Sequence, residues 1–353
     1  MRLSLGIGLA AAGLLGPAGG AAAVSWADLL KQDPAWYAGP EARAVAASIR
    51  QYQTEPGGWP KNADLSRPPS AEFLARTEPD HRAPTIDNGG TTTPLRILAR
   101  VAAAGDDASR ASFLRGLEYL LAAQYESGGW PQYYPLRPGY YTHITYNDDA
   151  MVNVLRLLRD VAAGGEPYGF VDADRRRRSA AAVERGVACI LRTQVVQDGR
   201  LTAWCAQHDE TTFAPAWARR FEPPSLSGME SVGLVRFLMS LEQPSPAVVA
   251  AVEGAVAWFA AVPVRGLRLE DAPGADGRPD RRAVADPAAP PLWARFYELG
   301  TNRPLFVGRD QVFHYDFNAV ERERRLGYAY LGTWPAALLA KEYPRWRARH
   351  SRP

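Results

Sequence analysis

One unit recurs along this chain: a helix, a loop with glycine and tryptophan, a polar loop, and a second helix. In the first copy, a helical segment at 42–52 leads to Gly-Gly-Trp-Pro at 57–60, and a second helix starts at Pro94, with Thr93 as its expected cap. One helical hairpin cannot bury its apolar face alone, so repeated hairpins pack side by side and wind into a ring. Strand signals are sparse. The repeat predicts an all-α fold: an incomplete α/α toroid of antiparallel helical hairpins with long irregular loops and few short strands.

The later copies follow the same order. The second has a helix through 113–124, Gly-Gly-Trp-Pro at 128–131, and a helix that Asn147 is expected to cap. A third, less regular copy has a helix near 178–194, a loop around Trp204, and a helix over 227–241. Gly-Thr-Trp-Pro at 332–335 opens the last helix, and 262–330 reads as a long irregular excursion before it.

The N-terminal residues indicate in which compartment the protein acts. Residues 1–23 have a positive start, a short apolar run and a small-residue cleavage site, which predicts a signal peptide and a secreted or periplasmic protein. We expect 24–353 to form a single catalytic domain and a monomer. No later segment is long and apolar enough to span a membrane, and no nucleic-acid motif accompanies the arginines. Cys189 and Cys205 could form one disulfide or remain two buried thiols.

The topology predicts where polar residues meet. If helices alternate between the outside and the inside of the ring, every inner helix starts at the same rim. The loops that carry Asp87, Asp149, His208 and Arg219 all precede inner helices, so these residues should converge. Helix N-termini add partial positive charge there, which favours an anionic ligand.

Carboxylates at this rim suggest a cation site. Asp148 and Asp149 could simply cap a helix, and Asp87 could simply form a turn. Their convergence, together with backbone and amide oxygens, favours Ca²⁺ instead. The five histidines have no paired spacing of the kind that zinc or iron sites use.

Aromatic and arginine residues suggest a carbohydrate ligand. Tryptophan or tyrosine side chains at the rim could stack on sugar rings, although core packing explains any single one equally well; the candidates are Trp59, Trp130, Trp204, Tyr133 and Tyr134. Arg295 and Arg309 lie in aromatic, glycine-punctuated irregular chain. Arginine there is costly unless a carboxylate pairs with it.

Five ordered motifs resemble one enzyme family. They are Gly-Gly-Trp-Pro-Lys-Asn at 57–62, Thr-Ile-Asp-Asn-Gly at 85–89, Thr-Tyr-Asn-Asp-Asp-Ala-Met at 145–151, Pro-Ser-Leu-Ser-Gly at 224–228, and the run 293–330. Together they resemble polysaccharide lyase family 10, the α/α-toroid pectate lyases, over about residues 35–346. The resemblance implies calcium-assisted β-elimination on polygalacturonate, which gives 4,5-unsaturated oligogalacturonides.

The resemblance also implies roles for residues. Arg309 matches the arginine base that takes the proton from C5 of the uronate, and Arg295 matches a residue that grips the substrate carboxylate. A positive cluster should lower the pKa of Arg309, so that an alkaline optimum is expected. Arg324, Arg219, Lys61, His208 and Trp204 complete the expected substrate-binding set. Asp87 and Asp149 match the calcium-associated aspartates, with Asp148 interchangeable with Asp149.

Two other functions remain open from the residues. A hydrolase could use Asp148 or Asp149 as acid and Asp87 as base. A pectin-binding protein could hold chains without cleaving them. A toroidal terpenoid cyclase is disfavoured, because the Asp148-Asp149 pair has no further aspartate to hold a diphosphate and its magnesium ion.

Overall fold

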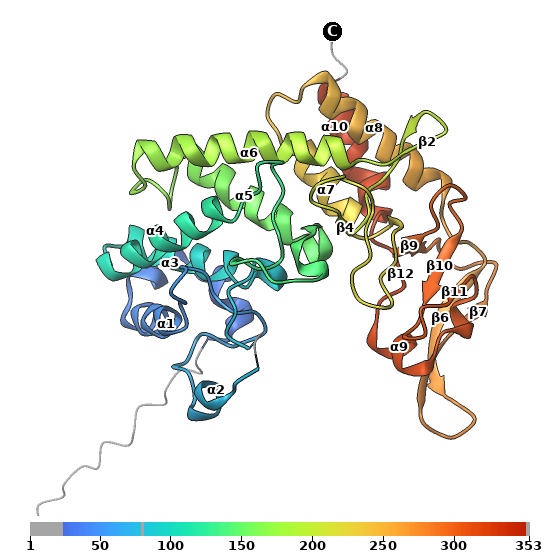
Figure 1. Cartoon of the computed structure of the whole chain (residues 1–353), viewed down its shortest axis with the longest axis horizontal. Helices are drawn as coiled ribbons and strands as arrows, with labels where there is room; N and C mark the ends of the chain where they lie inside the picture. Colours follow the sequence, from blue (N-terminus) through green and yellow to red (C-terminus); the bar gives the residue numbers. More distant parts are fainter. Residues whose placement is uncertain (1–23, 79–80, 351–353) are drawn as a thin grey trace, which may run out of the picture.

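The computed structural model describes residues 24–78 and 81–350, so the predicted signal peptide lies outside the described residues. Two sets of helices alternate along the chain (Figure 1). The outer set is α1 (Pro40–Gln51), α4 (Asp107–Ala122), α6 (Ala173–Thr193) and α8 (Pro246–Ala261). The inner set is α3 (Thr92–Ala103), α5 (Ala150–Ala163) and α7 (Glu230–Met239). Each inner helix packs against the outer helix that follows it and against the next inner helix. The predicted incomplete α/α toroid is confirmed.

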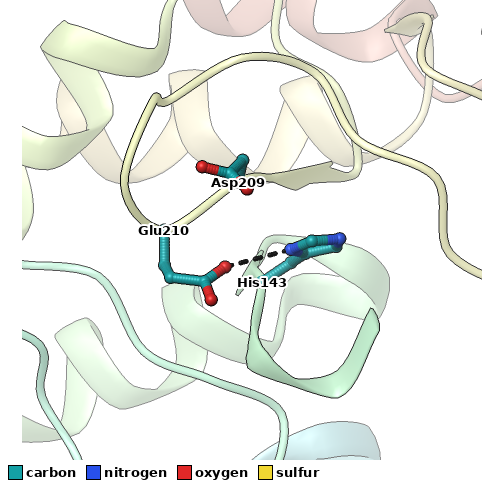
Figure 2. A group of neighbouring side chains, drawn as sticks. All are labelled: His143, Asp209 and Glu210. Atoms are coloured by element: carbon teal, nitrogen blue, oxygen red, sulfur yellow. Dashed lines mark hydrogen bonds and ion pairs between the residues drawn. The ribbon is translucent and has the colours of Figure 1, made fainter. Parts of the chain in front are cut away.

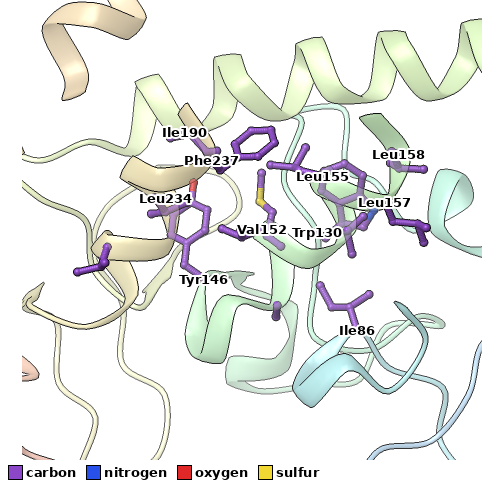
Figure 3. Packing of buried hydrophobic residues seen from close by; sticks show 14 of the residues in the cluster. Ile86, Trp130, Tyr146, Val152, Leu155, Leu157, Leu158, Ile190, Leu234 and Phe237 are labelled. Atoms are coloured by element: carbon purple, nitrogen blue, oxygen red, sulfur yellow. The ribbon is translucent and has the colours of Figure 1, made fainter. Parts of the chain in front are cut away.

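Most residues of each inner helix are buried. In α5, Met151, Val152, Leu155 and Leu158 are completely buried. Figure 3 shows Val152 and Leu155 between Trp130 and Phe237 of α7, with Leu158 on the other side of Trp130. The broad apolar face of α5 therefore packs into the core.

Each loop of the repeat is fastened by a glutamine that follows an outer helix. Its side-chain amide donates one hydrogen bond to a carbonyl of its own loop and a second to a carbonyl of the next outer helix. The three cases are Gln53 to Gly57 (2.7 Å) and Ser112 (3.0 Å), Gln124 to Gly128 (2.9 Å) and Ala182 (2.9 Å), and Gln194 to Thr202 (2.8 Å) and Ala251 (2.9 Å). These bonds satisfy carbonyls that an irregular loop would otherwise leave without partners.

The repeat tryptophans belong to the core. Trp59, Trp130 and Trp204 are completely buried. Each indole N–H donates to a carbonyl of the preceding outer helix, at 2.8, 2.8 and 2.7 Å respectively. The prediction that Trp204 binds substrate is therefore wrong, because no part of its ring is accessible and its one donor is used.

The excursion at 262–330 contains one regular element that the sequence reading did not predict. Strands β6 (Leu267–Pro273) and β7 (Pro279–Ala285) form an antiparallel hairpin with Leu267 opposite Ala285. Beyond it, β9 (Phe296–Tyr297) pairs with both β10 (Pro304–Val307) and β5 (Leu226–Ser227). The pairing with β5 fastens the excursion to the chain just before α7, which brings residue 295 to the start of an inner helix.

The remaining elements are short. They are the 3-10 helices η1 (Trp26–Lys31), η2 (Pro34–Ala38), η3 (Asp87–Gly89), η4 (Tyr140–Thr142), η5 (Asn147–Asp149) and η6 (Phe317–Ala319), the helices α2 (Ala71–Ala75), α9 (Arg322–Gly327) and α10 (Tyr343–His350), the π-helix η7 (Leu338–Glu342), and the strands β1 (Ile144–Thr145), β2 (Val196–Gln197), β3 (Arg200–Leu201), β4 (Gln207–His208), β8 (Trp293–Ala294), β11 (Phe313–His314) and β12 (Leu331–Gly332).

Cys189 and Cys205 are buried free thiols. Among the described residues, no helix is long and apolar enough to cross a membrane.

Candidate active site

The starts of two inner helices share an unusual backbone. In η3, Asn88 and Gly89 have φ of 49° and 69°. In η5, Asp148 and Asp149 have φ of 49° and 60°. Left-handed backbone at residues with side chains is strained, and such strain gathers at functional sites. The helix α5 starts after Asp149, whose side chain makes no capping bond, so the expected Asn147 cap is wrong. The expected Thr93 cap is wrong too, since α3 starts at Thr92.

Asp149 is a half-buried carboxylate, and among the described residues no hydrogen bond or ion pair holds it. Burial raises its pKa, the nearby carboxylates of Glu230 and Asp148 raise it further, and Arg156 and Arg236 oppose the rise. It lines a cavity of about 290 Å³ together with Asp148 and Glu230. Gly233 makes room for it, because a Cβ there would lie 1.8 Å from Asp149 Oδ1.

Arg295 is buried beside this cavity. Its Nη2 donates to Asp148 Oδ1 (3.1 Å), to Asn147 Oδ1 (3.2 Å) and to Glu230 Oε1. Burial alone would lower the pKa of Arg295, but Glu230, Tyr328 and Asp148 raise it, so the guanidinium stays charged. Its Nε is buried and has no hydrogen-bond partner in the part of the chain that the structure describes.

Sequence reasoning missed Glu230, the completely buried partner of Arg295. The backbone N–H of Glu230 donates to Ser227 Oγ (3.0 Å), and the Ser227 hydroxyl donates to the Glu230 carboxylate. The signal was present, because serine followed by glutamate three residues later marks a helix start. The pattern indicates a helix start and gives no sign that an arginine pairs with Glu230.

Four of the predicted arginines meet around two aromatic rings, Phe221 and Tyr328, whose centroids are 5.1 Å apart. The guanidinium carbons of Arg219, Arg309 and Arg324 lie 4.9, 5.7 and 4.6 Å from the Phe221 centroid. Those of Arg219 and Arg295 lie 5.7 and 4.6 Å from the Tyr328 centroid. Arginines far apart in sequence thus form one cluster that joins the carboxylate cavity through Arg295.

Two glutamates neutralise part of this cluster. Arg219 Nε donates to Glu222 Oε2 (2.8 Å), and Tyr328 donates its hydroxyl to Glu222 Oε1 (2.8 Å). Arg309 pairs with both oxygens of Glu323 at 3.1 Å, and Arg324 pairs with Glu323 too. The hydrogen bonds and charge of Glu323 raise the pKa of Arg309, whose side chain is 60% exposed. The expected lowering of this pKa is therefore wrong for the free protein.

Asp87 lies on the neighbouring helix start and is already paired. Its Oδ2 accepts hydrogen bonds from Lys61 Nζ and from Gln132 Nε2 (2.9 Å). Although burial lowers the pKa of Lys61, the charge and hydrogen bond of Asp87 raise it, so the ammonium group stays charged. The helices η3 and η5 pack together, but Asp87 does not line the cavity of Asp148 and Asp149.

His208 is a structural residue, which makes its predicted role in substrate binding wrong. It is completely buried; its Nε2 accepts a hydrogen bond from the backbone N–H of Cys205 (3.1 Å), and its Nδ1 donates to the carbonyl of Phe213 (2.8 Å). Burial lowers the pKa of His208 to about 4, so the ring is neutral at neutral pH.

A second group of possible ligands lies at the end of the β1–β4 pair: His143, Asp209 and Glu210, whose ligand atoms lie within 4.8 Å of one another (Figure 2). His143 Nδ1 and Glu210 Oε2 are 3.1 Å apart. Asp209 Oδ1 already accepts hydrogen bonds from the backbone N–H groups of Thr211 and Thr212. Calcium prefers oxygen ligands, of which this group offers the carboxylates of Asp209 and Glu210.

Comparison with known proteins identifies the chain. The profile of pectic acid lyases matches residues 53–339. The chain belongs to the pectic acid lyase family. A family 10 polysaccharide lyase from Cellvibrio cellulosa is 33% identical, with a TM-score of 0.75 over 91% of this chain and 94% of that one. An aspartate-to-alanine mutant of that lyase, in complex with trigalacturonic acid, is 31% identical, with a TM-score of 0.75 over 93% of this chain and 96% of that one. No curated protein gives a significant match.

Membership makes this protein a polysaccharide lyase and a pectate lyase by family. The family resemblance drawn from the motifs is confirmed. A cluster of guanidinium groups beside buried carboxylates is suited to a polymer that carries one carboxylate on every sugar.

Proposed function

We propose that this pectate lyase cleaves polygalacturonate by β-elimination and releases 4,5-unsaturated oligogalacturonides. The observation that carries the proposal is the cluster of Arg219, Arg295, Arg309 and Arg324 around Phe221 and Tyr328, next to the cavity of Asp148 and Asp149. The structural neighbour in complex with trigalacturonic acid supports the same substrate class.

Arg295 is the residue best suited to hold the carboxylate of the sugar that loses its C5 proton. Its Nη2 is taken by protein carboxylates, but its buried Nε–H has no partner within the described chain. A buried donor without a partner is costly unless a ligand supplies the acceptor. A fixed guanidinium there would stabilise the negative charge that spreads onto the carboxylate as the C5 proton leaves.

Two arginines are candidates for the base that removes this proton. Arg309 is the candidate from the sequence motifs, but it is exposed and shares no ring with Arg295. Arg219 stacks on the same tyrosine ring as Arg295, which supports it as the closer group to a sugar held by Arg295. Each is paired with a glutamate, Glu323 and Glu222 respectively, so either must give up this pairing to act as a base.

Calcium fits the carboxylate cavity. Asp149 would offer carboxylate oxygens that no described residue holds, and Asp148 and Glu230, which pair with Arg295, lie beside it in the same cavity. Bound there, calcium would neutralise the uronate carboxylate and so make the C5 proton more acidic. Asp87 lies at the neighbouring helix start, where its hydrogen bond with Lys61 would hold that side chain in place for substrate binding.

We further propose that 24–353 acts as one catalytic unit and as a monomer, exported by the signal peptide at 1–23. The family match over most of this range supports a single unit.

The deciding experiment is incubation of the purified protein with polygalacturonate, in calcium and in excess EGTA. A rise in ultraviolet absorbance from unsaturated products, in calcium only, is expected. New reducing ends without absorbance would instead support hydrolysis by Asp87 with Asp148 or Asp149. Binding without any cleavage would support a pectin-binding protein.

A further inference from the structure

A second cavity, of about 530 Å³, lies between the end of α1 and the short helix α2. It begins beside the active site: its lining includes Lys61, which pairs with Asp87, and Asn62, which accepts a hydrogen bond from Asn88 Nδ2 (3.0 Å). Its size falls within the range of small-molecule sites in proteins. In Figure 1, α2 projects on the same side of the molecule as α9 and the β6–β7 hairpin.

Aromatic rings form one wall of this cavity. Tyr52 and Phe73 make an edge contact with centroids 5.0 Å apart, and His81 lies 4.2 Å from Phe73. The Tyr52 hydroxyl donates to the carbonyl of Arg67 (3.1 Å), and His81 Nε2 bonds to the carbonyl of Phe73 (2.8 Å). These contacts hold the loop and α2 around the cavity and give it an apolar face of the kind that sugar rings pack against.

One cation of the cavity has no ion-pair partner. Lys61 pairs with Asp87, and Arg76 pairs with Glu78 (3.2 Å). Arg67 also lines the cavity, and its guanidinium makes no ion pair with any residue of 24–78 or 81–350. Asp64 balances the charge of Arg67 but does not pair with it, and it accepts from the backbone N–H of Ser66 (2.9 Å). The guanidinium of Arg67 is therefore available to a carboxylate ligand.

A row of tyrosines connects this cavity with the arginine cluster. Lys61 Nζ lies 5.7 Å from the Tyr133 centroid, Tyr133 is 5.3 Å from Tyr141, and Tyr141 is 4.1 Å from Tyr140. Burial raises the pKa of Tyr140 while the charge of Arg219 opposes the rise, so Tyr140 lies within electrostatic range of Arg219. Tyr133 is buried and packs beneath the surface, so only the half-buried Tyr140 and Tyr141 are accessible to a polymer held at Arg219 and Arg295.

We propose that the cavity beside Lys61 is a distal subsite for one further uronate residue of the substrate chain, with Arg67 binding its carboxylate and Tyr52 and Phe73 facing the sugar ring. The proposal rests on the proposed function, because it assumes that a galacturonan occupies the arginine cluster. Short oligomers held at the arginine cluster do not reach the distal subsite, whereas longer ones do.

The test compares trigalacturonate with hexagalacturonate for the wild type, Arg67→Ala and Arg67→Lys. We expect Arg67→Ala to lower kcat/KM on hexagalacturonate about tenfold, the effect of losing one charge-assisted hydrogen bond. Its kcat/KM on trigalacturonate should stay within about twofold of the wild type, since no new contact is lost there. Arg67→Lys should recover part of the loss. Arg177→Ala, an exposed arginine on the outer helix α6, is the matched control and should change neither value.

The outcomes separate the two proposals. An equal loss on both oligomers, or no loss on either, would overturn the distal subsite while leaving the lyase activity in place. Absence of cleavage in every variant would overturn the proposed function instead. Calorimetric titration of both oligomers in EGTA then tests the subsite alone: Arg67→Ala should weaken binding of the hexamer only, and unchanged binding of the hexamer would refute it.

Discussion

Arg295 and Glu230 form an ion pair that is almost completely buried, with side chains 6% and 0% exposed. The pair joins the irregular segment after the β6–β7 hairpin to the start of the inner helix α7. It fixes one end of the guanidinium, and the Nε–H has no hydrogen-bond partner among the described residues.

Variants of this pair can separate the structural role of Arg295 from its proposed catalytic role. Arg295→Met should abolish cleavage and also destabilise the protein by about 3–5 kcal/mol, because Glu230 is left buried without its partner. The double variant Arg295→Met, Glu230→Gln should recover most of this stability and remain inactive. Chemical denaturation and product absorbance measure the two effects. An active double variant would contradict the proposed role of Arg295.

Gly233 should prove essential for the position of Asp149. In Gly233→Ala the new methyl group would meet Asp149 Oδ1 at 1.8 Å, so the carboxylate must move out of the cavity. We expect loss of most lyase activity with only a modest fall in melting temperature. Gly165→Ala is the control, because nothing lies within 4 Å of a Cβ there. Full activity of Gly233→Ala would show that the position of Asp149 is unimportant.

Calcium should stabilise the wild type through Asp149. Calcium should raise the melting temperature and excess EGTA should reverse the rise, because a ligand that binds only the folded state stabilises it. Asp149→Asn should abolish this shift, whereas Asp209→Asn should leave it unchanged. The opposite pattern would move the calcium site to the cluster of His143, Asp209 and Glu210.

The pH–rate profile should distinguish the two candidate bases. A lysine ordinarily loses its proton at a lower pH than an arginine. Replacing the arginine that acts as base by lysine should therefore leave weak activity, and the rise of the cleavage rate with pH should occur at a lower pH. We expect this shift in Arg219→Lys and, in Arg309→Lys, a higher KM with the profile unchanged. The reverse result would restore Arg309 as the base.

His208 should make the fold sensitive to mild acid. Its pKa is about 4 in the folded protein against an ordinary value of 6.5, so between these values the unfolded chain binds a proton that the folded one does not. Its contribution to stability is present above pH 6.5 and is lost as the pH falls toward 4, by on the order of 3 kcal/mol. In His208→Gln this part of the pH dependence should vanish. Denaturant titrations at several pH values measure the free energy of unfolding. If this free energy changes equally with pH between 6.5 and 4 in both proteins, the prediction is refuted.

The sequence predicts the helical framework well because that framework depends on local patterns. The apolar spacing of Met151, Val152, Leu155 and Leu158 and the Gly-Gly-Trp-Pro loops place the inner helices and the turns before them. The β6–β7 hairpin was missed although Asp276-Gly277 lies between its strands, a common hairpin signal. The prolines that flank the hairpin favour irregular chain over strands, so the sequence pattern did not indicate it.

The site was harder to predict, because its electrostatics depend on partners distant in sequence. Burial of Trp204 and His208 is decided by neighbouring helices, which no local pattern reveals. The pKa of Arg309 rises because Glu323, fourteen residues later, folds back onto it. Glu230 could not be found from local sequence, because its partner Arg295 lies sixty-five residues later.

The glutamine bonds of the repeat give the ring a direction. Gln53, Gln124 and Gln194 each reach forward to the following outer helix, and the last of them depends on Ala251 of α8. Removing the first hairpin would leave every later glutamine amide with its hydrogen-bond acceptor. Ending the chain before α8 would remove one acceptor of Gln194. Relatives with fewer or additional hairpins should therefore differ at the leading edge of the ring, and its trailing edge should tolerate little change.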